Sequence, residues 1–403
     1  MQDDRTWTFR EIHGSSEALL AAVEEVERIA LIESNDTSPF CFRLLEFYPR
    51  GGSEYDFILT PTHDYERSAL SNYLTVSYVW AHEQPLDGTQ IPAYRIWDGT
   101  DLHKPPRPLR SPSIVFHRVV QFARSQNIRR IWLDQECINQ EDPTDIERHL
   151  QDMNRIYQFS RLTVAVLSRA VENWAMAVRC LNLGWTSDEQ DFELLQYMTQ
   201  DPWFTRSWTF HEQQCADDVV YLLPIQSSLK SKLAEVAPHV VFDHDAVIDH
   251  GMVYYRLTPT TKHDRKDPLL QSYFLRHNQG NWMSENIPGT IDTVYKKTQG
   301  RYNRVLSDRI QILANVCGLQ WKLKTTLLNN PALSFSTSLL VLVMANTWPD
   351  LVARARQYQE LEHCLMEKSI GMFMQEVSRK KYAQYVSELG RLSGLGLTSH
   401  SNV

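Results

Sequence analysis

Several short segments in the first half of the chain have the residue pattern of β-strands, either alternating between hydrophobic and polar or almost wholly apolar. These segments are residues 40–48, 56–59, 73–79, 130–134, 162–167 and 219–223. In other segments hydrophobic residues recur every three or four positions, which predicts helices at residues 15–32, 111–127, 143–157, 170–181, 191–199 and 201–214. Strands and helices that alternate along a chain form a parallel sheet covered by helices. The pattern therefore predicts an α/β fold.

The alternation weakens after about residue 225. Helical spacing returns at residues 306–316 and 351–392, so we expect a mainly helical region there. The predicted domains are an N-terminal helical segment (1–39), an α/β domain (40–225) and a mainly helical C-terminal region (226–403). Residues 84–110 are rich in proline and glycine, and we expect a long loop there.

Composition and charge exclude several classes of protein. The 403 residues carry a formal net charge of −8 and only short basic runs, which argues against a nucleic-acid partner. The most apolar run, residues 339–345, is far shorter than the roughly 20 residues of a membrane span. The N-terminus is acidic and polar, unlike a signal peptide. We therefore expect a cytoplasmic protein that binds neither nucleic acid nor membranes.

The six cysteines are scattered, with no C-x-x-C pair, so neither a metal site nor a disulfide framework is predicted. Cys137 has no evident histidine partner, which favours a buried structural thiol over a nucleophile. Trp132 is expected in the core, because it shares a strand face with Asp134 but lies deeper in the sheet.

Polar and aromatic side chains stand where the third and fourth predicted strands end. Asp134 closes the fourth strand, and Ser77, Tyr78 and Trp80 lie at the end of the third. Ligands of open α/β sheets bind in the crevice at the carboxyl ends of the strands. We therefore expect these four residues to bind a substrate. Two alternatives stay open, a capping or turn role for Asp134 and core packing for the aromatic rings.

A carboxylate ends an aromatic stripe on the helix predicted at residues 201–214. Phe204, Trp208 and Glu212 are spaced four residues apart and share one helix face. Partial burial there would raise the pKa of Glu212, whereas a neighbouring arginine would lower it. The alternative is an exposed or salt-bridged glutamate, the usual position of this residue type.

Three blocks of sequence are specific enough to indicate a family: YLTVSYVW (residues 73–80), IWLDQECINQED (131–142) and WFTRSWTFHEQ (203–213). In these blocks and in their order, the chain resembles fungal heterokaryon incompatibility (HET) domain proteins. SDRIQILANVCGL (307–319) is similar to a downstream segment of the same family.

The chain departs from the family pattern at three positions. Ala81 and Ser207 stand where the family usually has glycine, and His211 stands where it usually has glutamine. The resemblance implies a role in non-self recognition and regulated cell death.

The HET family is in turn distantly similar to Toll/interleukin-1 receptor (TIR) domains, which implies a TIR/flavodoxin-like sheet flanked by helices. Trp208 followed by Glu212 resembles the TIR segment whose glutamate is catalytic in the members that hydrolyse NAD. The resemblance implies a catalytic role for Glu212 and substrate binding by Trp208. Cleavage of the nicotinamide–ribose bond passes through an oxocarbenium-like state, which a carboxylate stabilises. Nicotinamide leaves as a neutral molecule, so no strong general acid is required.

Three functions follow as alternatives. The first is an NAD nucleosidase, for which NAD is a substrate and no cofactor is needed. The second is a non-enzymatic module that assembles with itself or with a separate recognition protein. The third is an enzyme acting on another small molecule, with a pocket at the strand ends.

Overall fold

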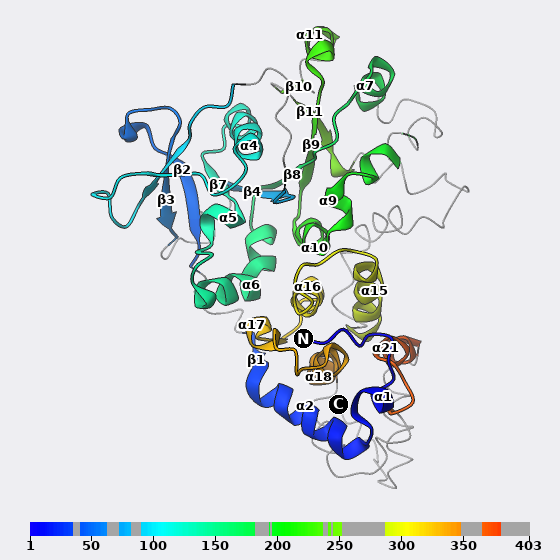
Figure 1. Cartoon of the computed structure of the whole chain (residues 1–403). Coiled ribbons are helices and arrows are strands. Elements are labelled where there is room, and N and C mark those ends of the chain that lie inside the picture. The colour runs from blue at the N-terminus through cyan, green and yellow to red at the C-terminus, as the bar shows by residue number, and fades with distance from the viewer. Residues whose placement is uncertain are drawn as a thin grey trace, which may run out of the picture. The chain divides into compact units, whose positions relative to one another are not determined.

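The structure is a computed structural model of residues 1–403 (Figure 1). Its description covers residues 1–34, 41–62, 72–81, 90–181, 193, 196–236, 241–242, 245–251, 287–347 and 365–379. In the helix predicted at 191–199, the described residues 193 and 196–199 are helical, whereas the helix predicted at 351–392 is described only at residues 365–379.

The chain folds into two compact units, each assembled from segments that are distant in sequence. We call Thr37–His277 with Gly300–Tyr302 the sheet unit. We call Met1–Asp36 with Asn278–Gln299 and Asn303–Val403 the helical unit. The first and the last helices of the chain therefore belong to the same unit.

The sheet unit is built on a mixed sheet whose described strands have the order β10-β11-β9-β8-β4-β7-β2-β3-β5-β6. Their bounds are β2 (Arg43–Phe47), β3 (Asp56–Pro61), β4 (Tyr73–Tyr78), β5 (Arg95–Asp98), β6 (Arg107–Pro108), β7 (Arg130–Trp132), β8 (Leu162–Val166), β9 (Val219–Pro224), β10 (Val241–Phe242) and β11 (Asp245–Asp249).

The strands β7, β4, β8 and β9 form a parallel core within this sheet. Their order in space is second, first, third and fourth along the chain, as in the first four strands of a flavodoxin-like sheet. All six residues of β4 are buried, because β4 has a strand on each edge and its side chains lie beneath helices of the sheet unit. The predicted α/β class is confirmed, and antiparallel strands extend the core on both sides.

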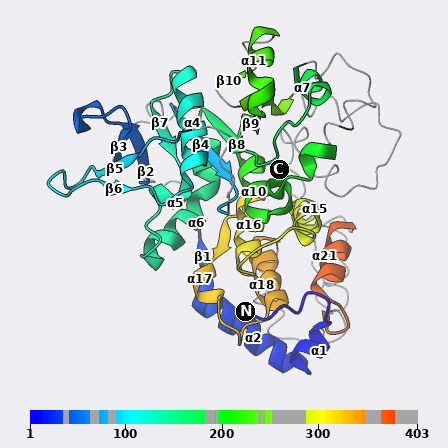
Figure 2. The ribbon, with the colours of Figure 1, turned by 45° about the horizontal axis from the view of Figure 1, so that its top comes forward.

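Helices cover both faces of the parallel core (Figures 1 and 2). Helix α4 (Ser113–Ser125) packs on β4 and β8, and α6 (Pro143–Gln158) packs with α10 (Ser207–Cys215), which also contacts β4. Right-handed crossovers require α4 and α6 to lie on opposite faces, because the strand order reverses at β4. The other helices in the described part of the unit are η1 (Pro49–Gly51), α5 (Asp134–Cys137), α7 (Trp174–Leu181), α9 (Pro202–Thr205) and α11 (Ser227–Val236).

The helical unit is organised around α18 (Phe335–Thr347), whose apolar run is buried on all sides. Around it pack α2 (Ser16–Ala30), α15 (Ile287–Gln299), α16 (Asp308–Val316) and α21 (Ile370–Arg379). The unit also contains α1 (Phe9–His13), α17 (Thr325–Leu328) and an antiparallel pair of β1 (Leu31–Glu33) with β12 (Trp321–Leu323). Within residues 287–347 and 365–379 the chain is thus mainly helical, as the pattern of its second half predicts.

Two sequence predictions in the sheet unit were wrong in part. Residues 84–110 are not simply a loop, since they contain β5 and β6; Arg95 in β5 binds the Asp56 carboxylate through two hydrogen bonds of 2.7 Å. The strand predicted at residues 130–134 ends at Trp132, and Asp134 instead begins α5. A helical turn forms there because the amide of Ile138 donates to the carbonyl of Asp134 (3.0 Å).

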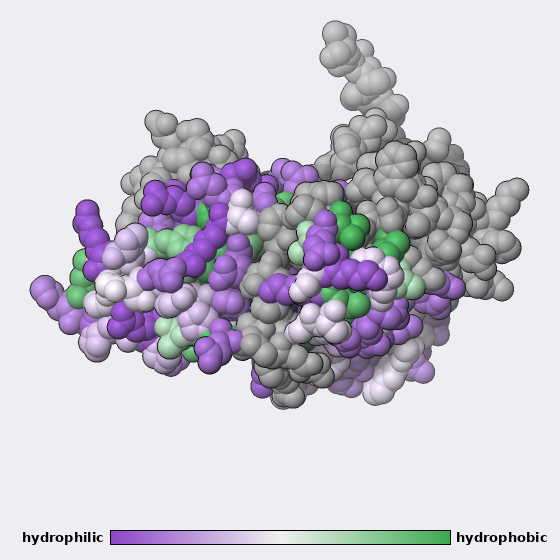
Figure 3. Space-filling model, turned by 90° about the horizontal axis from the view of Figure 1, so that it is seen from above, coloured by the Kyte–Doolittle hydropathy of each residue, from purple (hydrophilic) through white to green (hydrophobic). Residues whose placement is uncertain are grey.

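On the face drawn in Figure 3, most of the described residues are hydrophilic, and hydrophobic ones form small groups among them. No helix in the described part of the chain combines the length and the apolar character that crossing a membrane requires.

Candidate functional site

Three segments of the sheet unit converge at the carboxyl ends of its central strands. Ser77 and Tyr78 are the last residues of β4, Asp134 follows β7, and Glu212 lies on α10. Hydrogen bonds join β4 to each of the other two segments. These bonds join Ser77 to Glu212 and Tyr78 to Asp134, and the roles of these residues in binding or catalysis stay predictions.

Glu212 is buried at the inner face of α10. Only 8% of its surface is exposed, and its carboxyl accepts a hydrogen bond from the Ser77 hydroxyl. Ser77 in turn accepts one from the indole N–H of Trp203 (2.8 Å). The Tyr157 hydroxyl donates to the Val76 carbonyl (3.2 Å) and also lowers the pKa of Glu212. Glu212 therefore stands at the end of a buried chain of polar groups.

Burial raises the pKa of Glu212 to about 8. The hydrogen bond from Ser77 opposes this rise, the negative charge of Asp134 adds to it, and the positive charge of Arg206 opposes it. Glu212 is therefore largely protonated at neutral pH in the free protein. An added positive charge beside it would lower the pKa and release that proton.

Asp134 holds the residues that follow β4 in place. Its Oδ1 accepts bonds from the Tyr78 hydroxyl (2.8 Å) and from the Gln135 amide (2.7 Å). Its Oδ2 accepts one from the indole N–H of Trp80 (2.7 Å), a residue that is 40% exposed. Burial raises the pKa of Asp134, against the effect of these donors and of Arg206. Asp134 thus orients two aromatic rings, as an organiser of the site.

The predicted stripe of Phe204, Trp208 and Glu212 on one helix was wrong. The backbone leaves the helical conformation at Arg206 (φ −93°, ψ 145°), so Phe204 lies on α9 and the other two on α10. Trp208 is half-buried and packs edge-on against His211, with ring centroids 5.3 Å apart. A role for Trp208 in ligand binding stays a prediction.

The two residues assigned to the core are buried there. Trp132 is fully buried and packs edge-on against Tyr157, with ring centroids 5.6 Å apart. Burial raises the pKa of the Cys137 thiol to about 12, so little thiolate forms at neutral pH. Cys137 is therefore a structural residue, as predicted.

Sequence reasoning missed three contributors to the site. Trp203 and Arg206 lie inside the third family block, and that position could have indicated them as site residues. They were missed because the whole block was predicted to form one continuous helix. Tyr157 belongs to the apolar stripe of α6, which gave no sign that its hydroxyl meets Glu212. Among the described residues, no cluster of three or more His, Cys, Asp or Glu is arranged to hold a metal.

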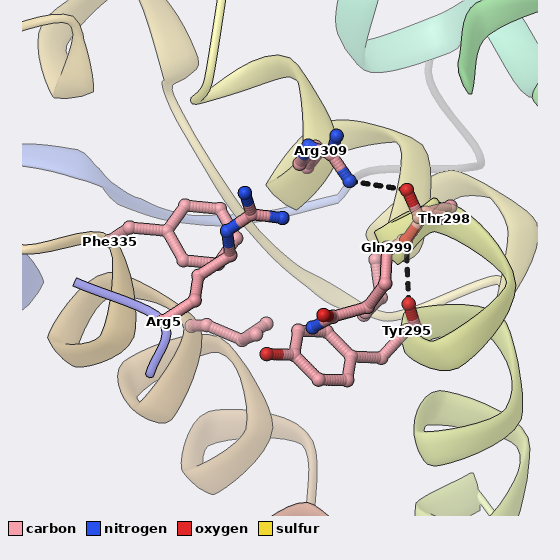
Figure 4. A pocket seen from close by; sticks show the side chains of 8 residues that line it. Arg5, Tyr295, Thr298, Gln299, Arg309 and Phe335 are labelled. Carbon is pink, nitrogen blue, oxygen red and sulfur yellow. Dashed lines mark hydrogen bonds between the residues drawn. The ribbon is translucent and has the colours of Figure 1, made fainter. Parts of the chain in front are cut away.

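A separate hollow of about 220 Å³, a volume that includes space open to solvent, lies in the helical unit (Figure 4). It is lined by Arg5, Tyr295, Thr298, Gln299, Arg309, Leu313, Phe335 and Leu339. Arg309 donates to the Thr298 carbonyl, and the Thr298 hydroxyl donates to the Tyr295 carbonyl (2.9 Å). None of the predicted site residues lines this hollow.

Comparison with protein families gives one match. Residues 73–212 match the family model of the heterokaryon incompatibility protein (HET). The match begins with β4 and ends at Glu212, so it contains every candidate site residue. A search of the curated proteins and a search of the solved structures each found no match. Residues 73–212 are therefore similar to the HET family, and the TIR part of the resemblance stays a prediction.

Proposed function

We propose that this chain acts in heterokaryon incompatibility as a trigger of regulated cell death, and that it does so by hydrolysing NAD at Glu212. The observation that carries the reaction is the state of Glu212: a buried carboxyl with a pKa of about 8, held by Ser77 at the carboxyl ends of the strands. The HET match supports the biological role.

The chemistry starts from the charge of the substrate. The nicotinamide ring of NAD is cationic, so its arrival lowers the pKa of Glu212 and the proton passes to solvent. The resulting carboxylate stabilises the positive charge that develops on the ribose as the bond to nicotinamide breaks. Nicotinamide leaves as a neutral molecule with the bonding electron pair. Water adds to the ribose carbon and loses one proton, which gives ADP-ribose.

The test is release of nicotinamide from NAD by the purified full-length chain. Glu212→Gln keeps the size and the neutral form of the side chain, so the fold is retained, and turnover is expected to fall by roughly a hundredfold or more. Glu141→Gln makes the same change at an exposed position and is expected to leave turnover unchanged. Full turnover by Glu212→Gln would refute the assignment.

A second candidate is a non-enzymatic assembly module, and one observation favours it. Ser77 is fully buried and Glu212 nearly so, and both satisfy their hydrogen bonds within the protein. A buried network of this kind stabilises a domain even when it takes no part in a reaction. This candidate predicts no nicotinamide release at any protein concentration, and cell death that persists in a Glu212→Gln strain.

A further inference from the structure

Arg206 interrupts what would otherwise be one helix, and the interruption is held by backbone bonds on both sides. The Tyr302 amide donates to the Thr205 carbonyl (2.7 Å), and the Ser207 amide donates to the Tyr302 carbonyl (3.1 Å). The carbonyl of Arg206 itself accepts from the Thr209 hydroxyl (3.0 Å) and from Arg301 (3.2 Å). The starting direction of the Arg206 side chain is therefore fixed by the fold.

The guanidinium of Arg206 is half-exposed and forms no ion pair or side-chain hydrogen bond within the described part of the chain. Other arginines of the same unit are paired with carboxylates: Arg43 with Asp145, Arg107 with Glu136 and Arg118 with Asp245. Arg206 thus differs from these three arginines, because its guanidinium has no carboxylate partner among the described residues.

The charge of Arg206 acts on both acids of the candidate site. It lowers the pKa of Glu212 and the pKa of Asp134, which places the guanidinium within electrostatic reach of both carboxyls. Because Glu212 is largely protonated at neutral pH, it does not neutralise this charge. A positive charge beside a neutral acid is a favourable position for an anion.

Two neighbouring features add to this. Arg206 stands at the N-terminus of α10, whose nine residues start without a side-chain cap, and the partial positive charge of that helix end favours anions. Trp80, bound to Asp134 through its N–H, keeps part of its indole ring exposed. The cationic guanidinium of Arg206 and the exposed part of the Trp80 ring therefore both lie near the Asp134 carboxyl.

We propose that Arg206 binds the phosphate of a nucleotide at the HET-domain site. The inference rests on the proposed function in that it concerns the same site, but it does not require that the bound nucleotide be cleaved. Arg206 is a binding residue that selects phosphorylated ligands over their nucleoside counterparts, since a guanidinium forms paired hydrogen bonds with phosphate oxygens.

The experiment measures binding by calorimetry for ligands that differ in phosphate. Nicotinamide mononucleotide carries one phosphate, nicotinamide riboside carries none, and ADP-ribose carries phosphates without nicotinamide. Measurements in the Glu212→Gln background prevent turnover. Adding Arg206→Gln is expected to weaken binding of the mononucleotide and of ADP-ribose by roughly tenfold or more, and to leave binding of the riboside unchanged.

Two further variants keep the result interpretable. Arg161→Gln removes the same charge from an exposed position at the amino end of β8, away from the site, and is expected to change no affinity. Arg206→Lys keeps the charge but not the paired hydrogen bonds. Its affinity for the mononucleotide and for ADP-ribose is expected to lie between those of Arg161→Gln and Arg206→Gln. Thermal unfolding of each variant shows whether it is folded.

The outcomes separate this inference from the proposed reaction. Equal weakening of all three ligands, no weakening, or no nucleotide binding at all would overturn the role of Arg206. Binding of ADP-ribose that depends on Arg206, without nicotinamide release from NAD by the unmodified chain, would support the inference and refute the reaction. Nicotinamide release with an unchanged KM in Arg206→Gln would refute the inference alone.

Discussion

At the scale of single residues, the site depends on how burial controls two carboxyl groups. Glu212 and Asp134 both have raised pKa values, but they are bound differently. Asp134 accepts hydrogen bonds from three donors: the Tyr78 hydroxyl at the end of β4, the Trp80 indole after β4 and the Gln135 amide in α5. Glu212 keeps its proton and accepts a hydrogen bond from the Ser77 hydroxyl. The difference makes Glu212 the group whose charge a ligand can change.

The stability of the folded chain should therefore depend on pH through Glu212. Because the pKa of Glu212 is raised to about 8 in the folded state, its contribution is fully present below the ordinary glutamate pKa and is lost as pH rises to about 8. In that window the free energy of unfolding should fall by about 1.4 kcal/mol per pH unit from this group. Glu212→Gln should remove that slope.

Urea unfolding from pH 5.5 to 8.5 measures this slope. The exposed substitution Glu141→Gln serves as the control and should keep the slope of the unmodified chain. If Glu212→Gln and the unmodified chain lose stability in parallel, Glu212 is ionised in the folded state and the proposed electrostatics are wrong.

Much of the residue-level site could be predicted because strand ends are visible in sequence. Ser77 and Asp134 each follow a short apolar run, and parallel strands bring such ends together. The burial of Glu212 could not be predicted from its helix, because α10 buries polar residues on nearly every side. Its partners Ser77 and Tyr157 come from other elements, and no local pattern indicates them.

At the scale of elements, a buried ion pair links a helix on the sheet to strands of the sheet. Arg118 of α4 binds Asp245 of β11 and also donates to the carbonyls of Leu167 (2.8 Å) and Leu222 (3.0 Å). Both charged side chains are almost fully buried. One arginine therefore ties a helix to the ends of β8 and β9 and to β11.

Asp245→Asn should destabilise the sheet unit by about 3 kcal/mol, because it leaves the Arg118 charge buried without its partner. The exposed pair of Arg124 and Glu54 supplies the control, and Glu54→Gln should cost less than about 1 kcal/mol. Urea unfolding followed by tryptophan fluorescence measures both. Equal effects of the two substitutions would show that the buried pair adds nothing beyond a surface pair.

The break between α9 and α10 is the element that sequence reasoning could not predict. Hydrophobic spacing continues through Arg206 without interruption, and no glycine or proline marks a stop. The break is stabilised instead by Tyr302, which is remote in sequence and pairs with the backbone on both sides of Arg206. Long-range pairing of this kind overrides local helix propensity.

At the scale of the whole molecule, the two ends of the sequence contribute to the same helical unit. Asp4, which is fully buried, accepts a hydrogen bond from the amide of Ser336 (2.9 Å) in the first turn of α18. The N-terminal segment thus caps a helix that lies 332 residues further along the chain. The helical character of the second half could be predicted, but this capping could not.

Asp4→Ala should destabilise α18 by about 1–2 kcal/mol, because an N-terminal amide loses its acceptor and the helix end loses a favourable negative charge. Asp3→Ala removes a carboxylate from an exposed pair with Arg5 and should cost less than about 1 kcal/mol. Hydrogen exchange of the α18 amides measures the effect directly. Unchanged protection in Asp4→Ala would contradict the capping role.

The pairing of Tyr302 with the backbone around Arg206 also bears on how such domains are inherited. A gene segment that encodes only residues 73–212 carries Ser77, Asp134 and Glu212 into a new protein. It does not carry Tyr302, so Arg206 arrives without the residue that pairs with its backbone. Recombination that moves the matched segment alone therefore transfers the acids of the site but not the fixed position of its cation. Any recipient must supply its own pairing partner for the backbone at Arg206.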